Sequence, residues 1–555
     1  MDVQSLDKKL NKLCKRNKAV GVNVALFDSE KILYNYNFGF ANREKKIKSN
    51  NDSLYMIGSN TKVLTALGIL KLMEEGKLSL DEDIRKHIPE FEIKSNFEYE
   101  KITIEHLLMH RSGLVSDLFH LILDKSRDYH DVINELKNTY LTAEPGKMFA
   151  YSNVGYTVLG IVIERVSGLS YKEYVQREIA KPMGVSIHFF LNEEDRNSYS
   201  EQVSLSYDKK GKEVEDMLGT LLPAGSNTYM SLNDFVKFGQ MFLNKESVLL
   251  KKETLEFMET LNLDEPLDKE VYNVGYGLIH KQYDMGKQVG KVLGHGGNTT
   301  CHHSIFNYIP DLDIGIVVMT NSQRAISLSG MAAMTVLVEG LKEKGISVEE
   351  VPMEYEHIDC DDTRLVGRYA TAMGMMDVSL NNKKELVTKA NKIPIRLCLC
   401  EDGYFQCMPV KAIHKIPVLK RSIQVMRLKP AIYMGEDILL FEQTGKYHKT
   451  RGIIGCKYEE TKISNVFKEA CGTYQVADER FKHFECKCSL KTEGDVLALD
   501  INALNAKIKG CLKVIDDNTA FLQGFGRMAR TSVEVCKKDG EMYVNFSGVS
   551  FKKVI

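Results

Sequence analysis

A serine and a lysine three residues apart, Ser59 and Lys62, stand at the start of an apolar segment of the chain. Residues with this spacing share one face of a helix, so the hydroxyl can lie beside the amine. The helix dipole would also favour negative charge on the serine oxygen. The same Ser-x-x-Lys pattern occurs at residues 5–8 and 206–209. Taken alone, it fits a helix-capping serine beside a solvated lysine as well as it fits a nucleophile beside its base.

A second polar group, Tyr151-Ser152-Asn153, lies between the turn sequence EPGK and another apolar segment. A phenol titrates at about pH 10 and is a poor base at neutral pH, but a neighbouring ammonium group stabilises the phenolate and lowers its pKa. We expect Lys62 to supply that charge. The alternative is a buried aromatic ring with a capping asparagine, which is our interpretation of the similar sequence YVN at residues 543–545.

The third group is the sequence GHGGN at residues 294–298, which leads into a strand-like segment. Glycines at the start of a strand often mark the close approach of a ligand or of another backbone. A histidine at this place can donate to a bound carboxylate or carbonyl, and a following backbone N–H can face an oxyanion. The next histidines, His302 and His303, point to opposite faces of a strand, which argues against joint metal binding. We expect neither a metal site nor a cofactor.

In this order, the three groups resemble the motifs of the serine β-lactamase and penicillin-binding-protein superfamily. The most similar branch contains class C β-lactamases, D-alanyl-D-alanine carboxypeptidases, D-aminopeptidases and related esterases. Further segments up to about residue 340 look like the same branch, among them KLSLDEDIRKHIPEF, ITIEHLLMHRSGL and PDLDIGIVVMTNS. The full set favours the catalytic interpretation of Ser59 over the capping one.

The resemblance implies a role for each motif residue. Ser59 would be the acylated nucleophile, Lys62 its proton-transfer partner, and Tyr151 the general base or acid. Asn153 would bind the lysine and the amide of the substrate.

The third motif departs from one part of the family. His295 and Gly297 would stand where class C β-lactamases have Lys-Thr-Gly. The pattern His-x-Gly looks more like the D-peptidases and D-aminopeptidases, so it argues against efficient β-lactam hydrolysis. The backbone N–H groups of Ser59 and Asn298 would form the oxyanion hole.

The elements that carry these motifs follow from the hydrophobic periodicity. Alternation over residues 20–40 predicts a β-hairpin, and apolar residues at helical spacing predict a helix over 60–75 that ends at Gly76. Residues 75–250 are mostly helical in pattern, after which strand signals return. We therefore expect a sheet whose strands come from both ends of the first 340 or so residues, covered by an amphipathic helix at 327–345.

The C-terminal third is rich in strand patterns and is expected to contain two similar units. An acidic segment at 348–362 reads as a linker, and Gly367 and Gly472 each begin a run of short alternating strands. The fold class we predict is an α+β β-lactamase/transpeptidase-like domain, an antiparallel sheet with flanking helices and a helical subdomain, followed by two small antiparallel, lipocalin-like β-barrels. The predicted domains are 1–350, 351–458 and 459–555.

Composition excludes several classes of protein. With 74 basic and 75 acidic side chains the net charge is −1, which disfavours nucleic acid as a partner. The N-terminus lacks the apolar core of a secretory signal, and no run reaches the length of a membrane span, so we expect a cytoplasmic protein without membrane contact. Ten of the 12 cysteines follow residue 350 and lack zinc-type spacing, which is typical of reduced thiols.

The sequence thus predicts a serine hydrolase that works through an acyl-enzyme. We expect a small molecule or a short peptide as its substrate. Assembly into a homo-oligomer is left open. The expected substrates are small D-amino-acid amides or peptides, because the histidine motif and the two barrels resemble D-aminopeptidases. Three alternatives remain open. Two are enzymes of the same superfamily, a carboxylesterase or transacylase and a β-lactamase. The third is a non-catalytic ligand-binding protein on an inactive hydrolase fold.

Overall fold

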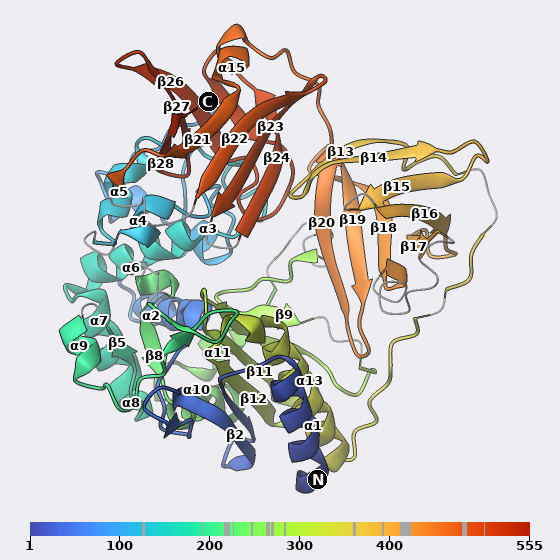
Figure 1. Cartoon of the computed structure of the whole chain (residues 1–555). Helices are drawn as coiled ribbons and strands as arrows, with labels where there is room; N and C mark the ends of the chain where they lie inside the picture. Colours follow the sequence, from blue (N-terminus) through green and yellow to red (C-terminus); the bar gives the residue numbers. More distant parts are fainter. Residues whose placement is uncertain are drawn as a thin grey trace.

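The computed structural model of the 555-residue chain contains one large antiparallel sheet, a helical region and two β-barrels (Figure 1). It describes all residues except 125–127, 191–192, 216–221, 226, 246–247, 262, 264–266, 268–270, 282–284, 354, 359–361, 391–392, 411–422, 480–485, 504–505 and 555.

The large sheet joins strands from both ends of the first 340 or so residues, as predicted. Its order is β3-β2-β1-β12-β11-β10-β9, and β1 pairs antiparallel with both β2 and β12. The strands are β1 (Gly21–Phe27), β2 (Ile32–Asn42), β3 (Ile47–Lys48), β9 (Ile279–Lys281), β10 (Val292–Asn298), β11 (His303–Ile309) and β12 (Ile314–Thr320). The hairpin predicted over 20–40 is β1 and β2.

The sheet has a hydrophobic core on each face. Alternate residues of β1 take part in the two cores: Val24 packs towards α1 (Val3–Arg16) and α13 (Ile326–Glu343), and Ala25 packs towards the helical region. This alternation is what a strand buried on both sides requires. The helix 323–343, which includes α13, passes a length and composition test for a membrane span, but 56% of its apolar window is buried inside the molecule. It covers β11 and β12, as the amphipathic pattern predicts.

The helical region surrounds α2 (Thr61–Glu74), which is buried along almost its whole length. A helix that is apolar on all sides belongs in a core. Gly76, with φ +68°, ends the helix as predicted. A small sheet of β4 (Tyr55–Met56), β8 (Thr228–Met230) and β5 (His188–Phe189) also lies here and was not predicted. The other helices are α3 (Ile104–Leu108), α4 (Phe119–Leu123), α5 (Asp131–Leu136), α6 (Asn153–Ser167), α7 (Tyr171–Tyr174), α8 (Lys181–Met183), α9 (Glu193–Asn197), α10 (Leu232–Asn244) and α11 (Lys252–Met258).

The C-terminal third forms two closed eight-stranded barrels, which confirms the predicted fold class. The first contains β13 (Gly367–Thr371), β14 (Gly374–Leu380), β15 (Leu386–Ala390), β16 (Ile393–Leu399), β17 (Phe405–Pro409), β18 (Met426–Tyr433), β19 (Glu436–Thr444) and β20 (Lys449–Lys457). The second contains β21 (Gly472–Val476), β22 (Lys487–Glu493), β23 (Val496–Ala503), β24 (Ala506–Val514), β25 (Thr519–Leu522), β26 (Ser532–Lys538), β27 (Glu541–Phe546) and β28 (Val549–Lys553). All of these strands lie within the predicted domain bounds, and the bounds themselves stay a prediction.

The two barrels begin in the same way. Gly367 and Gly472 open their first strands, and two residues later Tyr369 and Tyr474 each donate a hydrogen bond to the carbonyl four residues before them. The predicted repeat is therefore present in the structure.

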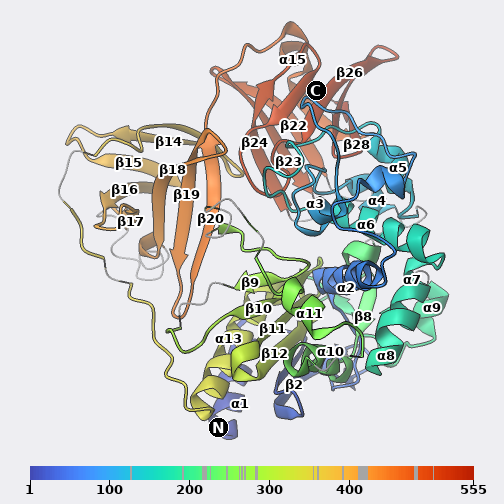
Figure 2. The ribbon, with the colours of Figure 1, turned by 180° about the vertical axis from the view of Figure 1, so that it is seen from behind.

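The segment predicted as a linker lies along the first barrel. The ring of Tyr355 stacks on the guanidinium of Arg427 at 3.9 Å, and His357 bonds to Gln406 at 2.7 Å. The side chain of Arg427 is itself buried and forms an ion pair with buried Glu442. The second barrel, in contrast, rests on the helical region around α3 to α6 (Figure 2).

Candidate active site

Ser59 lies in a short 3₁₀ turn, η1 (Gly58–Asn60), directly before α2. The turn is packed tightly on one side, because a Cβ on Gly225 would lie 2.3 Å from the Gly58 carbonyl oxygen and 2.8 Å from the Ser59 nitrogen. No side-chain hydrogen bond from Ser59 caps the helix, and the residue at the cap position of α2 is Asn60. The capping interpretation of Ser59 is therefore wrong.

Lys62 is fully buried on the first turn of α2, with its Nζ 3.2 Å from Ser59 Oγ. It also donates to Asn153 Oδ1 at 2.7 Å and to the carbonyl of Ala224 at 2.5 Å. Burial lowers the pKa of Lys62 well below its ordinary value, and the positive charge of Arg527 lowers it further, against the opposite effect of Asp117. The side chain therefore tends towards the neutral amine.

A neutral amine at this place has one way to share its hydrogen bonds. It carries two N–H donors and one lone pair, and the carbonyl oxygens of Asn153 and Ala224 can only accept. Both N–H groups are thereby used, so the lone pair is left for the hydroxyl of Ser59. The arrangement makes Lys62 able to take the serine proton.

Tyr151 donates a hydrogen bond from its Oη to Ser59 Oγ at 2.9 Å. Its ring stacks on buried His110, with centroids 4.4 Å apart. The next residue, Ser152, caps α6 and donates to the carbonyl of Val115 at 2.7 Å, which fixes the backbone beside the phenol. The sequence therefore folds locally so that the phenol points at the nucleophile.

The expected shift of the phenol pKa is wrong for this structure. Burial raises the pKa of Tyr151 to about 12, although the hydrogen bond with Ser59 and the charge of Arg527 act in the other direction. The phenol therefore stays protonated at neutral pH and acts on Ser59 as a donor.

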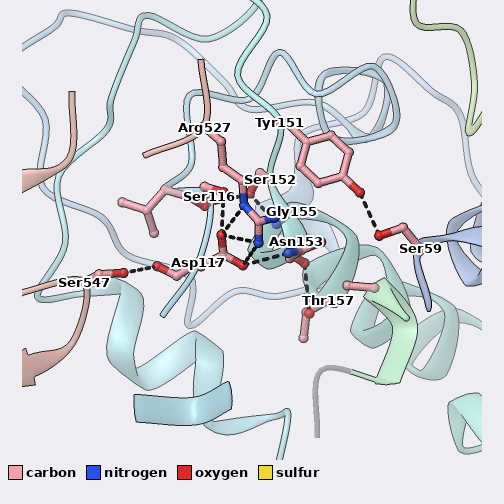
Figure 3. A network of polar contacts seen from close by, with 12 residues as sticks. Ser59, Ser116, Asp117, Tyr151, Ser152, Asn153, Gly155, Thr157, Arg527 and Ser547 are labelled. Carbon is pink, nitrogen blue, oxygen red and sulfur yellow. Dashed lines mark hydrogen bonds and ion pairs between the residues drawn. The ribbon is translucent and has the colours of Figure 1, made fainter. Parts of the chain in front are cut away.

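Asn153 connects Lys62 to a buried carboxylate. Its Nδ2 donates to Asp117 Oδ1 at 2.6 Å (Figure 3), while its Oδ1 accepts from Lys62. Asp117 has no exposed side-chain surface and forms a bidentate ion pair with Arg527 of the second barrel. Burial alone would raise the pKa of Asp117, but the Arg527 charge and hydrogen bonds from Ser116 and Asn153 outweigh it and lower the pKa.

The third predicted group runs along β10, beside η1. A Cβ on Gly297 would lie 1.9 Å from the carbonyl oxygen of Ile57, so strand and turn meet with no space for a side chain. A Cβ on Gly58 would lie 3.1 Å from the Asn298 nitrogen, which places that backbone N–H next to the serine turn. The ring of His295 is buried, and its Nδ1 lies 2.8 Å from the Gly296 carbonyl.

The structure thus brings Ser59, Lys62, Tyr151 and Asn153 into direct contact and sets the third motif along the same turn. It adds four residues that sequence reasoning missed, Asn60, His110, Asp117 and Arg527. The amide of Asn60, oriented to satisfy both of its polar atoms, bonds to the His295 carbonyl and the Gly297 N–H and ties η1 to β10. His110 stands in the family-like segment ITIEHLLMHRSGL, which was the available signal for it.

Comparisons with known proteins identify the family of the chain. The protein-family model described as Beta-lactamase matches residues 6–338. Protein flp of Staphylococcus aureus (strain N315) is 32% identical over 210 residues, which make up 38% of this chain and 42% of that protein. The chain thus spans less than half the length of the curated relatives it matches.

Two solved structures share the fold. The octameric penicillin-binding protein homologue from Pyrococcus abyssi has 22% identity and a TM-score of 0.54, with 100% of both chains covered. EstCE1, a hydrolase with promiscuous acyltransferase activity, has 19% identity and a TM-score of 0.50, covering 60% of this chain and 98% of its own. Because the family model spans more than half of the chain, this protein belongs to the beta-lactamase family and has that family's hydrolase fold.

Proposed function

We propose that the protein is a serine hydrolase that acts on amide or ester bonds through an acyl-enzyme at Ser59. The observation that carries the proposal is the position of Lys62: its buried amine lies 3.2 Å from Ser59 Oγ and donates to two carbonyl oxygens, so in its neutral form the amine has a lone pair that can accept the serine proton. This is the geometry expected of a nucleophile beside its base.

The proposed reaction has two stages. In the first, Lys62 takes the Ser59 proton while Oγ attacks the substrate carbonyl, and the N–H groups of Ser59 and Asn298 stabilise the oxyanion. The leaving group then receives a proton from Lys62, with the Tyr151 hydroxyl as donor and relay. In the second stage, water gives one proton to Lys62 and attacks the acyl ester; Lys62 then returns that proton to Ser59 Oγ as the bond to the acyl group breaks, which releases the acid and restores the free serine.

For the substrate, we propose small D-amino-acid amides or short peptides. His-x-Gly in place of Lys-Thr-Gly and the presence of two barrels support this choice over a β-lactam. A carboxylesterase or transacylase is the second candidate, since EstCE1 shares the fold of the catalytic region. A binding protein without activity is the remaining alternative, and the intact contacts of Ser59, Lys62 and Tyr151 argue against it.

A turnover panel tests these alternatives. Wild type and Ser59→Ala are compared on D-alanine p-nitroanilide, p-nitrophenyl butyrate and nitrocefin. We expect hydrolysis of the D-amide by wild type and loss of at least about a thousandfold in the variant, because the nucleophile is gone. Hydrolysis of the ester without the D-amide would overturn the proposed substrate class. A folded wild-type chain that takes no covalent fluorophosphonate label at Ser59 would overturn the hydrolase itself.

We also propose that the chain forms a homo-oligomer. The support is the octameric homologue that shares its fold over the whole length. Sedimentation velocity on the full chain would give its mass, and a monomer at all concentrations would contradict the proposal.

A further inference from the structure

A segment of the second barrel enters the active site from outside the catalytic region. Between β25 and β26, Arg527 donates from Nε to Asp117 Oδ2 at 2.9 Å and from Nη2 to Oδ1 at 3.0 Å. The planar fork of an arginine matches a carboxylate in this bidentate way, and such pairs are among the stronger and more directional polar contacts in proteins.

Asp117 is the point at which this contact meets the catalytic residues. It is fully buried, and besides Arg527 it accepts hydrogen bonds from Ser116 Oγ at 2.6 Å and Asn153 Nδ2 at 2.6 Å. A buried carboxylate is costly unless it is paired and hydrogen-bonded. The guanidinium thus compensates a charge that lies in another domain.

The carboxylate in turn determines how the amide of Asn153 lies. An ionised carboxylate only accepts, so the NH₂ group of Asn153 must face Asp117, and its oxygen must face Lys62. Reversal of this amide would place N–H groups against Lys62 and remove the acceptor that uses one of its N–H groups. An unbroken series of contacts therefore leads from Arg527 through Asp117 to Asn153, as Figure 3 shows, and from Asn153 to the amine of Lys62.

We propose that Arg527 is a positioning residue of the catalytic site: it holds the Asp117 carboxylate, which fixes the amide of Asn153 and, through it, the amine of Lys62. This role rests on the proposed function of Ser59 and Lys62. Through Arg527, the second barrel would position the catalytic residues, in addition to any role in limiting access of the substrate.

A simple tether between domains is the rival explanation, and the structure offers a matched control for it. Ser547, in the turn between β27 and β28, donates from its Oγ to the backbone carbonyl of Asp117 at 2.5 Å, and its backbone carbonyl accepts from the N–H of Phe119 at 2.9 Å. It therefore holds the same segment from the same barrel without touching the carboxylate. Loss of Ser547 Oγ weakens the tether and leaves the series of contacts to Lys62 intact.

The charge of Arg527 also acts on the pKa of Lys62, so its removal should change the pH dependence of Ser59 reactivity. Among the described residues, the titratable and charged groups that act on Lys62 or lie around it are Tyr151, Tyr156, His110, His295, Asp117 and Arg527. Burial holds the pKa of His110 well below its ordinary value, so that ring is neutral. Removal of Arg527 takes away a positive charge that lowers the pKa of Lys62 and leaves the Asp117 charge, which raises it. The pH below which Lys62 is protonated therefore moves upward.

The experiment measures labelling of Ser59 by a fluorophosphonate, as a second-order rate constant from intact-protein mass spectrometry between pH 5 and 10. The full-length chains are wild type, Arg527→Met, Arg527→Lys, Ser547→Ala, Asp117→Asn and Arg527→Met with Asp117→Asn. For Arg527→Met we expect at least about a tenfold loss at neutral pH and an acid limb displaced upward by about one pH unit. Arg527→Lys should recover part of the rate, and Ser547→Ala should keep the wild-type profile.

Because Arg527 is proposed to act through the carboxylate, its loss should have little further effect once Asp117 is Asn. A folded Arg527→Met chain with the wild-type rate and pH profile would overturn the proposal, as would an equal loss in Ser547→Ala. If Arg527→Met fails to fold, Arg527→Lys decides by the same two readouts. Wild type without label at Ser59 would instead overturn the proposed function, and this role with it.

Discussion

At Ser59, one oxygen atom contacts an amine and a phenol, and burial determines what each of them does. A phenolate would require a charged lysine beside it, whereas burial drives Lys62 towards its neutral form and raises the pKa of Tyr151 to about 12. The sequence led us to expect that a charged Lys62 would lower the pKa of Tyr151. That expectation failed because burial favours the neutral form of Lys62 and so removes the charge that would have stabilised a phenolate.

This division of roles predicts the pH dependence of the enzyme. The rate should rise with pH as Lys62 loses its proton, at a pH well below that of an ordinary lysine, and should not fall up to about pH 10, since Tyr151 stays protonated. Tyr151→Phe should lower kcat about a hundredfold or more and leave the acid limb where it is. Initial rates from pH 5 to 10 on the best substrate of the panel measure both.

Tyr543→Phe is the matched control, because it changes a tyrosine in the same Tyr-x-Asn pattern on a barrel strand. Its profile should equal that of wild type. A basic limb near pH 8 that disappears in Tyr151→Phe would show that the phenol titrates as a base, contrary to the assignment given above.

At the scale of elements, the turn η1 that carries Ser59 is packed closely between two other backbone segments. Gly225 lies against it on one side and Gly297 of β10 on another. The glycines of β10 were predicted from sequence to mark a close approach, and Gly294 and Gly297 do. What the pattern could not show is that the approaching group is the turn carrying the nucleophile, since this contact joins segments more than two hundred residues apart.

Adjacent glycines of β10 make this packing testable. In Gly297→Ala the new methyl group would lie 1.9 Å from the Ile57 carbonyl oxygen, so η1 must move away from the strand. We expect kcat/KM to fall about a hundredfold, because a displacement of about 1 Å is enough for that, and the free energy of unfolding to fall by about 1–3 kcal/mol.

Gly296→Ala, on the same strand, provides the comparison, because the nearest neighbour of its methyl group would be the Ser304 carbonyl oxygen of β11 at 3.9 Å. Its stability, from denaturant unfolding, and its kcat/KM should stay close to those of wild type. Equal effects of the two substitutions would mean that the strand itself, and not its contact with the turn, is sensitive.

At the scale of the whole molecule, the sequence allowed prediction of the features that have a local pattern, but not of the contacts between domains. The four catalytic motif residues and the two barrels each have a signal within a short window, such as the equivalent Gly367 and Gly472. Asp117 and Arg527 are 410 residues apart and belong to no motif with a mechanism, so neither residue predicts the other. Their pairing follows from where the second barrel lies on the helical region.

The attachment of that barrel predicts a local effect on stability. Gly548 has φ +78°, and a Cβ there would lie 1.8 Å from His120 Nδ1 in the catalytic region. In Gly548→Ala the buried ring must move, which loosens the Ser547 contacts beside it. We expect faster backbone amide exchange over residues 116–123, measured by hydrogen exchange and mass spectrometry.

Gly540→Ala separates the contact from the backbone strain. Gly540 has almost the same φ of +79°, and nothing lies within 4 Å of its Cβ position. Both variants therefore bear the cost of a left-handed alanine, and the difference between them reports the contact with His120 alone. Equal exchange over residues 116–123 in the two variants would contradict the predicted attachment.

Because the chain is synthesised from its N-terminus, the ion pair between Asp117 and Arg527 can form only late in synthesis. A ribosome that adds about 5–20 residues each second completes the segment with Ser59, Lys62 and Tyr151 long before it reaches Arg527. Between the end of α13 at Glu343 and Arg527, an interval on the order of 10–40 s, the hydrolase region contains Ser59 but lacks the cation opposite Asp117. Asp117 thus gains its counter-ion late in synthesis, and a chain cut short before the second barrel lacks it.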